Sequence, residues 1–142
     1  MANYYCTSRT NYFRVTDEDA YGKLFENLCS EDNIEDFTKT DKDGVIWHGF
    51  GSYSTIDYVE PSEDEDSDND PDFNLFAKQL QEILPENEAF VLLEAGNEKL
   101  RHITGYATII TKNDFRCIDL TEMARNECKK LLGPDFETKM EY

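Results

Sequence analysis

Residues 89–120 read AFVLLEAGNEKLRHITGYATIITKNDFRCIDL, and this stretch decides the fold class. Its β-branched and aromatic residues predict three strands, over residues 89–93, 101–111 and 115–120. Turn residues separate the strands, at Gly96-Asn97 and over residues 112–114. Strands joined by short turns pair in antiparallel order, so the stretch predicts a β-meander.

One amphipathic helix follows the meander and another precedes it. The helix after the meander is expected to be capped by Thr121 and ended by Gly133-Pro134. Its apolar residues are expected to face inward, namely Met123, Ala124, Cys128, Leu131 and Leu132. The helix before the meander begins in the turn Pro71-Asp72 and stops at Pro85. Its expected buried stripe consists of Phe73, Phe76, Ala77, Leu80, Ile83 and Leu84.

The first half of the chain adds a further helix and several strands. Residues 4–15 predict a strand or a strand pair, interrupted by the polar run from Thr7 to Asn11. Thr16 is the expected N-cap of a helix whose apolar face ends at Leu28. The remaining elements are an irregular connection or short strand and then two strands, over residues 33–39, 45–51 and 52–59.

Together these elements predict an α+β fold with about three helices packed on one antiparallel sheet. Their order is β-α-β-β-(acidic loop)-α-β-β-β-α. Residues 1–134 are expected to form a single domain, a size at which roughly two thirds of the unfolded surface becomes buried. A flexible acidic loop is expected at residues 60–71, and residues 135–142 are expected to form a C-terminal tail.

The charge balance indicates the kind of partner. The chain holds 31 acidic residues against 14 basic ones, a formal net charge of -17. Residues 1–72 carry 19 acids and 5 bases, whereas residues 73–142 carry 12 acids and 9 bases. Such a chain repels nucleic acid and anionic membranes, so we expect no direct binding to either. It attracts basic protein surfaces or cations, and the alternative explanation of the charge is solubility alone.

The cysteines and the apolar runs bear on the compartment. The four cysteines, Cys6, Cys29, Cys117 and Cys128, include no C-x-x-C pair. We expect structural thiols in a reducing cytosol, with Cys29 and Cys128 on or beside the apolar faces of helices. The start of the chain lacks the apolar run of a signal peptide, and no apolar stretch reaches membrane-spanning length. A cytoplasmic location is therefore expected.

The sequence holds no motif of an enzyme. No phosphate-binding loop, zinc-protease motif or nucleophile elbow occurs, so we expect a protein without enzymatic activity. Structural roles are expected for the two histidines, His48 and His102. The spacing leaves open a cysteine–histidine nucleophilic pair, because the members of such pairs meet only in the fold. The alternative function is a small ligand-binding or enzymatic domain, with a pocket built from Arg9, Arg14, Glu98 and Arg101.

Residues 57–72 contain nine acids and no base. Within them, the stretch Asp66-Ser67-Asp68-Asn69-Asp70-Pro71 begins like a calcium loop, with carboxylates at its first, third and fifth positions. Its sixth position needs a glycine and holds Pro71, and its twelfth needs a glutamate and holds Ala77. We therefore expect no specific metal site and no cofactor.

The carboxylates are expected to form a surface that binds a partner protein. Duplex DNA carries a negative charge about every 1.7 Å along its axis, and a protein of comparable carboxylate density can occupy a basic nucleic-acid-binding channel. Other acidic protein-binding roles are also open. One acidic patch is expected from Glu31 to Asp43. The residues expected to bind the partner are Glu31, Asp32, Glu35, Asp36, Asp57, Glu60, Glu63, Asp64, Glu65, Asp66, Asp68 and Asp70.

Two blocks resemble those of a known group of proteins. They are Ser8-Arg9-Thr10-Asn11-Tyr12-Phe13-Arg14-Val15 and the block from Leu93 to Ala107, which reads LEAGNEKLRHITGYA. Both resemble blocks of small uncharacterised proteins encoded by phages, plasmids and integrative elements. The resemblance implies an antagonist of host defence, of the anti-CRISPR or antirestriction kind, and assigns no functional residue. Combined with the charge, it predicts an inhibitory protein that docks on a basic nucleic-acid-binding surface of a defence effector.

Overall fold

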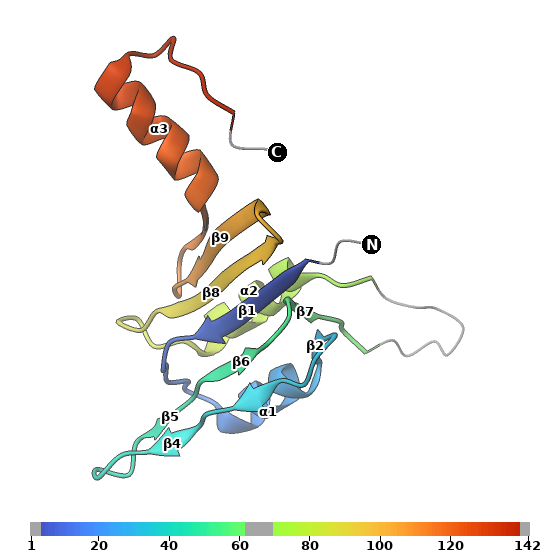
Figure 1. Cartoon of the computed structure of the whole chain (residues 1–142). Helices are drawn as coiled ribbons and strands as arrows, with labels where there is room; N and C mark the ends of the chain where they lie inside the picture. Colours follow the sequence, from blue (N-terminus) through green and yellow to red (C-terminus); the bar gives the residue numbers. More distant parts are fainter. Residues whose placement is uncertain (1–3, 62–69, 140–142) are drawn as a thin grey trace.

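A computed structural model of the chain describes residues 4–61 and 70–139. Over these residues the chain has the predicted α+β fold, with three helices, a six-stranded antiparallel sheet and two small two-stranded sheets (Figure 1). The helices are α1 (Glu18–Glu26), α2 (Phe73–Ile83) and α3 (Leu120–Leu132). The strands are β1 (Tyr5–Thr10), β2 (Leu28–Ser30), β3 (Glu35–Asp36), β4 (Lys39–Thr40), β5 (Ile46–Trp47), β6 (Phe50–Ser52), β7 (Ile56–Tyr58), β8 (Phe90–Glu98), β9 (Arg101–Ile110) and β10 (Phe115–Asp119).

The large sheet has the strand order β10-β9-β8-β1-β6-β3. Its first three strands are those of the predicted β-meander, which is confirmed. β1 pairs with β8 on one side and with β6 on the other, so it joins the two halves of the chain. β3 forms the far edge of the sheet, paired with β6.

The first turn of the meander lies later in the chain than predicted. β8 continues through the predicted turn to Glu98, which pairs with Arg101, and Lys99 between them has a positive φ of 56°. Gly96 is required inside the strand, because a Cβ there would lie 2.5 Å from the carbonyl oxygen of Tyr5 in β1. This glycine therefore marks the close approach of two strands and not a turn.

The polar run near the start of the chain does not interrupt β1, contrary to the prediction. Strand alternation places Cys6, Ser8 and Thr10 on the buried face of β1 and their neighbours on the exposed face. These side chains are small, and the Thr10 hydroxyl accepts a hydrogen bond of 3.0 Å from the backbone N–H of Phe50. The apolar pattern predicted a strand here but did not reveal that it is continuous, because its buried face is polar.

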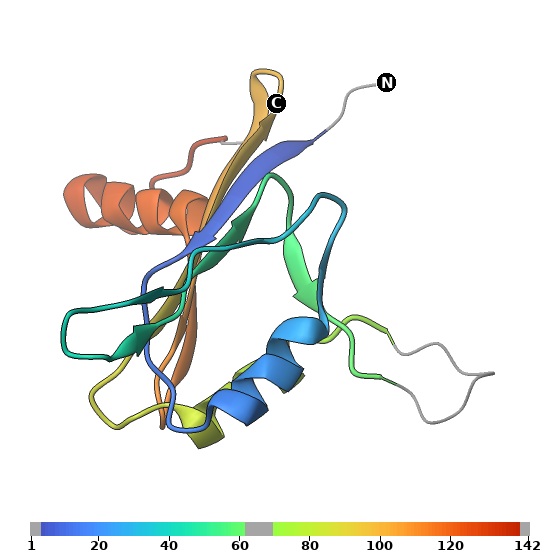
Figure 2. The same cartoon turned by 90° about the horizontal axis from the view of Figure 1, so that it is seen from below.

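Helices α1 and α2 cover one face of the large sheet (Figure 2). The core between them and the sheet is aromatic, and the rings of Phe13 and Phe90 meet edge to face with centroids 5.1 Å apart. Most of the predicted stripe of α2 is confirmed as core, since the buried residues there are Phe76, Ala77, Leu80, Ile83 and Leu84.

Two helices begin at an aspartate and not at the predicted threonine. The Asp17 carboxylate accepts a hydrogen bond of 3.0 Å from the Ala20 N–H at the start of α1. Asp119 accepts one of 2.9 Å from the Thr121 N–H at the start of α3. Thr16 and Thr121 were therefore wrongly predicted as caps. Aspartate and threonine both cap helices well, so a run of such residues leaves the boundary open by a position or two.

Helix α3 lies on the other face of the sheet and extends away from it (Figures 1 and 2). None of its residues is buried, and Met123, Leu131 and Leu132 are 53%, 75% and 67% exposed. Ala124 and Cys128 are half-buried. The prediction of an inward position was therefore wrong for Met123, Leu131 and Leu132. Helical periodicity shows that one side is apolar, and it does not show what covers that side.

The segment between α1 and α2 forms more strands than predicted. In the described part of this segment, six short strands, β2 to β7, replace the predicted connection and two strands. Cys29 lies in β2 and not on a helix face, while His48 forms an isolated bridge with Phe13 between β5 and β6. Strands of two or three residues are too short for their alternation to be read from a sequence.

Candidate functional site

Seven of the predicted partner-binding residues lie in the described part of the chain, and we call these seven the acidic surface. They are Glu31 and Asp32 after β2, Glu35 and Asp36 in β3, Asp57 in β7, Glu60 after β7 and Asp70 before α2. The other five lie outside the described residues, and they are Glu63, Asp64, Glu65, Asp66 and Asp68.

The pairing of β2 with β7 places two members of the acidic surface near each other. Cys29 of β2 stands opposite Asp57 of β7, and Glu31 follows β2 directly. Burial raises the pKa of the Cys29 thiol, and the negative charge of Asp57 raises it further. Asp57 therefore stands beside the end of β2, where the acidic connection to β3 begins.

A backbone hydrogen bond links the end of β7 to the start of α2. The N–H of Asp72 donates to the carbonyl oxygen of Tyr58 over 2.7 Å. Glu60 and Asp70 each lie two residues from this bond, so both stand at the end of β7. Burial raises the pKa of the Tyr58 phenol, and the charge of Glu60 adds to the shift.

Glu35 and Asp36 lie on the edge strand β3 and point to opposite sides of the sheet. Glu35 stands opposite Gly51 of β6, and Asp36 stands opposite Phe50. Phe50 is a core residue, and the charge of Asp36 contributes, after burial, to the raised pKa of Tyr21 in α1. Asp36 is therefore on the side of α1, and Glu35 is on the other side. The edge of the sheet carries negative charge on both faces, which divides the predicted patch.

Asp41 belongs to a turn and not to the acidic surface. Its carboxylate accepts hydrogen bonds from the indole N–H of Trp47 at 3.0 Å and from the backbone N–H groups of Val45 and Asp43 at 3.0 and 2.8 Å. These bonds favour the charged form, so they hold the pKa of Asp41 below its ordinary value, with the Trp47 bond contributing most. Asp41, one carboxylate of the predicted patch from Glu31 to Asp43, is therefore engaged inside the turn.

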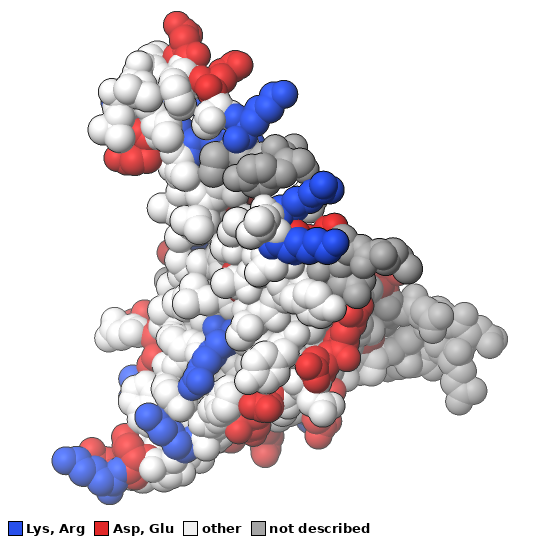
Figure 3. Space-filling model, viewed as in Figure 1, with Lys and Arg blue, Asp and Glu red and all other residues white. Residues whose placement is uncertain are grey.

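The acidic surface is exposed and has few counter-charges. All of its members are exposed except Asp57, which is half-buried. Six of the seven form no salt bridge with a described residue, and they are Glu31, Asp32, Glu35, Asp36, Asp57 and Asp70. Figure 3 shows acidic side chains gathered next to the grey segment, separate from a band of basic side chains on the same face.

The described residues divide into an acidic part and a neutral part. Residues 4–61 and 70–90 hold 17 acids and 6 bases, a net charge of -11. Residues 91–139 hold 8 acids and 8 bases, so the segment that forms most of the meander and α3 is neutral. The asymmetry seen along the sequence is therefore also an asymmetry between parts of the fold.

The four residues of the alternative pocket do not converge. Arg9 stacks over the ring of Phe37 at 4.3 Å on the surface of the sheet. Arg14 lies beyond one end of β1 and forms a salt bridge of 3.0 Å with a glutamate that precedes β8. Glu98 and Arg101 pair at the turn between β8 and β9, beside the opposite end of β1. These side chains therefore line no common cavity.

His48 takes part in a structural network. Its Nε2 lies 2.7 Å from the Glu18 carboxylate, and its Nδ1 lies 3.3 Å from the Thr38 hydroxyl. Its ring centroid is 4.1 Å from that of Tyr21, so His48 links α1 to the segment between β5 and β6. Neither ring nitrogen bonds a cysteine of the described chain. His102 is exposed and has a positive φ of 48° near the turn of the meander.

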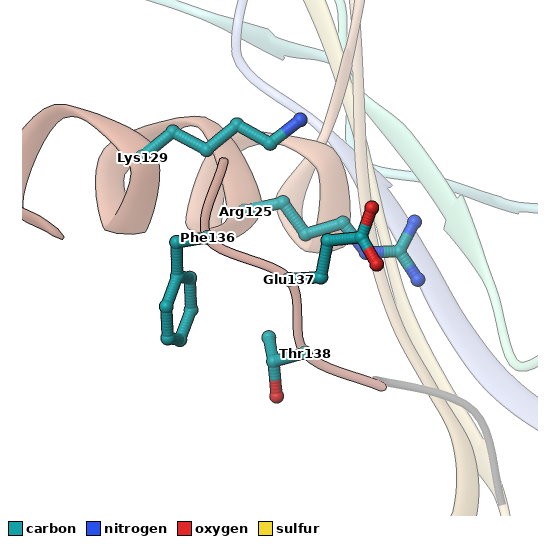
Figure 4. Close-up of a pocket in the computed structure, with 5 residues that line it drawn as sticks. All are labelled: Arg125, Lys129, Phe136, Glu137 and Thr138. Carbon is teal, nitrogen blue, oxygen red and sulfur yellow. The ribbon is translucent and has the colours of Figure 1, made fainter. Parts of the chain in front are cut away.

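The sequence did not predict a polar hollow between α3 and β9. Its lining includes His102, Thr104 and Tyr106 from β9 and Glu122, Arg125 and Lys129 from α3. Figure 4 shows the adjoining hollow, where Arg125 and Lys129 extend from α3 and the following tail carries Phe136 and Glu137 past them. The basic residues of α3 were the only signal in the sequence. Charges of both signs line these hollows, which lack the character of an anion site.

The described ranges, 4–61 and 70–139, hold no group of three His, Cys, Asp or Glu side chains that could bind a metal ion. The stretch that begins like a calcium loop includes Asp66 and Asp68, which lie outside these ranges. None of the described helices is long and apolar enough to cross a membrane.

The fold and the acidic surface together define a class: an α+β protein with a carboxylate-rich part and a neutral part. Comparison of the chain with protein-family models, curated proteins and solved structures found no match. The functional interpretation therefore depends on the acidic surface.

Proposed function

We propose that this protein is an inhibitor without enzymatic activity, which docks on a basic nucleic-acid-binding surface of a host-defence effector such as a CRISPR or restriction complex. The supporting observation is the acidic surface. Six of its seven carboxylates form no salt bridge with a described residue, and they lie in β3, in β7, directly after β2 and before α2.

The carboxylates favour a cationic partner for a simple electrostatic reason. The six carboxylates without a salt bridge have no counter-charge among the described residues, and a basic surface that docks against them supplies one. A groove that binds a phosphate backbone already presents lysine and arginine at close spacing. Binding to the backbone does not depend on base sequence, so a protein that competes for the groove needs negative charge and not base-like chemistry. An occupied groove cannot hold nucleic acid, and this blocks the effector without catalysis.

The direct test is displacement of nucleic acid from a purified effector. A fluorescent duplex bound to each of several CRISPR and restriction effectors is titrated with the protein, and anisotropy reports its release. We expect release from a responsive effector at about 50 mM salt and at least tenfold weaker competition at about 200 mM salt. Competition that does not change with salt would contradict an electrostatic mechanism.

A pair of matched variants locates the docking surface. Glu31→Lys with Glu35→Lys reverses two members of the acidic surface whose side chains make no hydrogen bond with a described residue, so the fold is expected to be unaffected. Asp135→Lys with Glu137→Lys makes the same change in net charge after α3. The first pair is expected to weaken competition roughly tenfold and to flatten its salt dependence, because charges at the contact dominate. If both pairs weakened competition equally, net charge alone would explain binding, and the acidic surface would not be the docking surface.

Four of the five predicted residues outside the described ranges are tested separately. A charge-reversed set at Glu63, Asp64, Glu65 and Asp66 is expected to weaken competition further and to lower its dependence on salt. Normal competition by this variant would show that these carboxylates serve only solubility.

A further inference from the structure

The six-stranded sheet has an exposed area on the side away from α1 and α2. Those two helices cover the other side, and α3 meets the exposed side at β9, where Leu120 packs over Gly105 (Figure 2). Over β1, β6 and β8 this side stays exposed in the described chain, and Tyr5, Tyr53 and Leu93 are 68%, 70% and 56% exposed. We call this area the open face, and it consists of Tyr5, Arg9, Phe37, Tyr53, Leu93 and Ala95.

Strand pairing brings the residues of the open face together. Arg9 of β1 stands opposite Leu93 of β8 on one side and opposite Gly51 of β6 on the other. Because side chains alternate along a strand, Arg9 and Leu93 both point away from the core. The Arg9 guanidinium lies 4.3 Å from the centroid of the Phe37 ring. The open face is therefore a continuous surface of aromatic, aliphatic and arginine side chains.

Acidic residues are sparse on this side of the sheet. Among the acids of the six described strands, alternation places only Glu35 on the side of the open face. The others point to the opposite side, and they are Asp36, Glu94, Glu98 and Asp119. Figure 3 views the open face, and few acidic side chains lie in its middle. Exposed tyrosine and arginine with little negative charge are typical of a contact between proteins.

A hollow joins the open face to the acidic surface. Its volume is about 100 Å³, and its lining includes Arg9, Phe37 and Tyr53 of the open face and Glu35 of the acidic surface. Glu35 and Arg9 both stand opposite Gly51, so the three residues form one row across the sheet. A partner that contacts Glu35 therefore also reaches the open face.

We propose that the open face binds the same partner protein as the acidic surface, through an apolar patch that lies beside the basic groove of the effector. This inference rests on the proposed function and names a second contact that the docked protein makes. The two contacts have different tasks. Charged groups accelerate the encounter with the groove, whereas burial of exposed aromatic and aliphatic side chains slows dissociation.

The position of the acidic surface disfavours two other occupants of the open face. A nucleic acid bound there would place phosphates beside Glu35 and close to the acidic part, whose described residues carry a net charge of -11. A second copy of the chain would bring two acidic parts together across the same border. A protein with basic residues next to an apolar patch meets neither repulsion.

The test is the kinetics of binding to an immobilised effector from which the protein displaces nucleic acid. Tyr53→Ala with Leu93→Ala is expected to raise the dissociation rate constant at least about tenfold and to leave the salt dependence of association unchanged. Tyr106→Ala with Leu131→Ala is the matched control. These two residues are 43% and 75% exposed, and they lie on the other side of the sheet and on α3. The control is expected to dissociate like the wild-type chain, and circular dichroism checks the fold of both variants.

The outcomes separate this inference from the proposed function. If no effector is displaced, the proposed function fails and this inference fails with it. If an effector is displaced and both variants dissociate at the same rate, the proposed function stands and the inference is overturned. Sedimentation of the free chain and titration with a labelled single-stranded DNA test the other occupants. A dimer or a DNA complex that Tyr53→Ala with Leu93→Ala abolishes, and the control does not, would also overturn the inference.

Discussion

At the scale of single residues, Asp41 shows how one carboxylate can be removed from a binding surface. It lies among acidic neighbours in the sequence, yet its two oxygens accept three hydrogen bonds inside the turn between β4 and β5. One of these donors is Trp47, the only tryptophan of the chain. A fluorescent side chain therefore reports directly on the protonation of this carboxylate.

We predict that Trp47 fluorescence changes in an acid titration with a midpoint below the ordinary aspartate pKa of about 3.9. The pKa of Asp41 is lowered in the folded state, first by the Trp47 hydrogen bond. Its contribution to stability is therefore complete above the unfolded pKa and is lost as the pH falls through the folded pKa. Asp41→Asn keeps a side-chain oxygen but not the charge, and it is expected to abolish the transition. A transition that persists unchanged in Asp41→Asn would assign it to another group.

At the scale of elements, the predictions of buried faces succeeded where the apolar residues of an element face the core. The stripe of α2 predicted a buried helix, and Phe76, Leu80 and Leu84 are fully buried. The same periodicity in α3 predicted an inward face, yet Met123, Leu131 and Leu132 are mostly exposed. In β1 the error was the reverse, since Ser8 and Thr10 are buried although they are polar. A sequence pattern shows whether one face of an element is apolar or polar, and it does not show which elements pack against that face.

The same distinction applies to the acidic surface. The excess of carboxylates in the first half of the chain is visible in composition alone. Which carboxylates lie together is set by pairings such as Cys29 with Asp57, which join residues far apart in the chain. The opposite directions of Glu35 and Asp36 follow from a two-residue strand that no pattern could predict.

We predict that two glycine substitutions have opposite effects on the free energy of unfolding. Gly96→Ala in β8 is expected to destabilise by about 1–3 kcal/mol, because the new Cβ meets the backbone of Tyr5 and the Cβ of Cys6 in β1. Gly22→Ala in α1 meets nothing within 4 Å and is expected to stabilise by about 0.5–1 kcal/mol. Urea unfolding of both variants measures the two changes. Equal effects at the two positions would mean that β1 and β8 are not in close contact at Gly96.

At the scale of the whole molecule, the net charge of -17 opposes the compact state. Most of it resides in the acidic part, whose described residues carry a net charge of -11. Repulsion among exposed charges is screened over about 10 Å at 0.1 M salt, comparable to distances across a small protein. The same carboxylates that are proposed to attract a partner therefore weaken the fold when no partner is bound.

We predict that the melting temperature rises with added sodium chloride. About 1 kcal/mol of relieved repulsion corresponds to a rise of roughly 4 °C for a protein of this size. Glu31→Lys with Glu35→Lys is expected to melt higher than the wild-type chain at low salt and to respond less to added salt. Calorimetry at several salt concentrations measures both effects. A melting temperature that falls with salt in the wild-type chain would show that favourable ion pairs outweigh the repulsion.

The position of Glu35 and Asp36 has a consequence for self-assembly. β3 is only two residues long, and in the described chain it ends the six-stranded sheet with a carboxylate on each face. A strand of another molecule that approached this edge would meet a negative charge on each side of the backbone groups with which it would pair. These charges hinder fibril growth from this edge. Removal of both charges, as in Glu35→Gln with Asp36→Asn, is therefore expected to turn this edge into a template for aggregation.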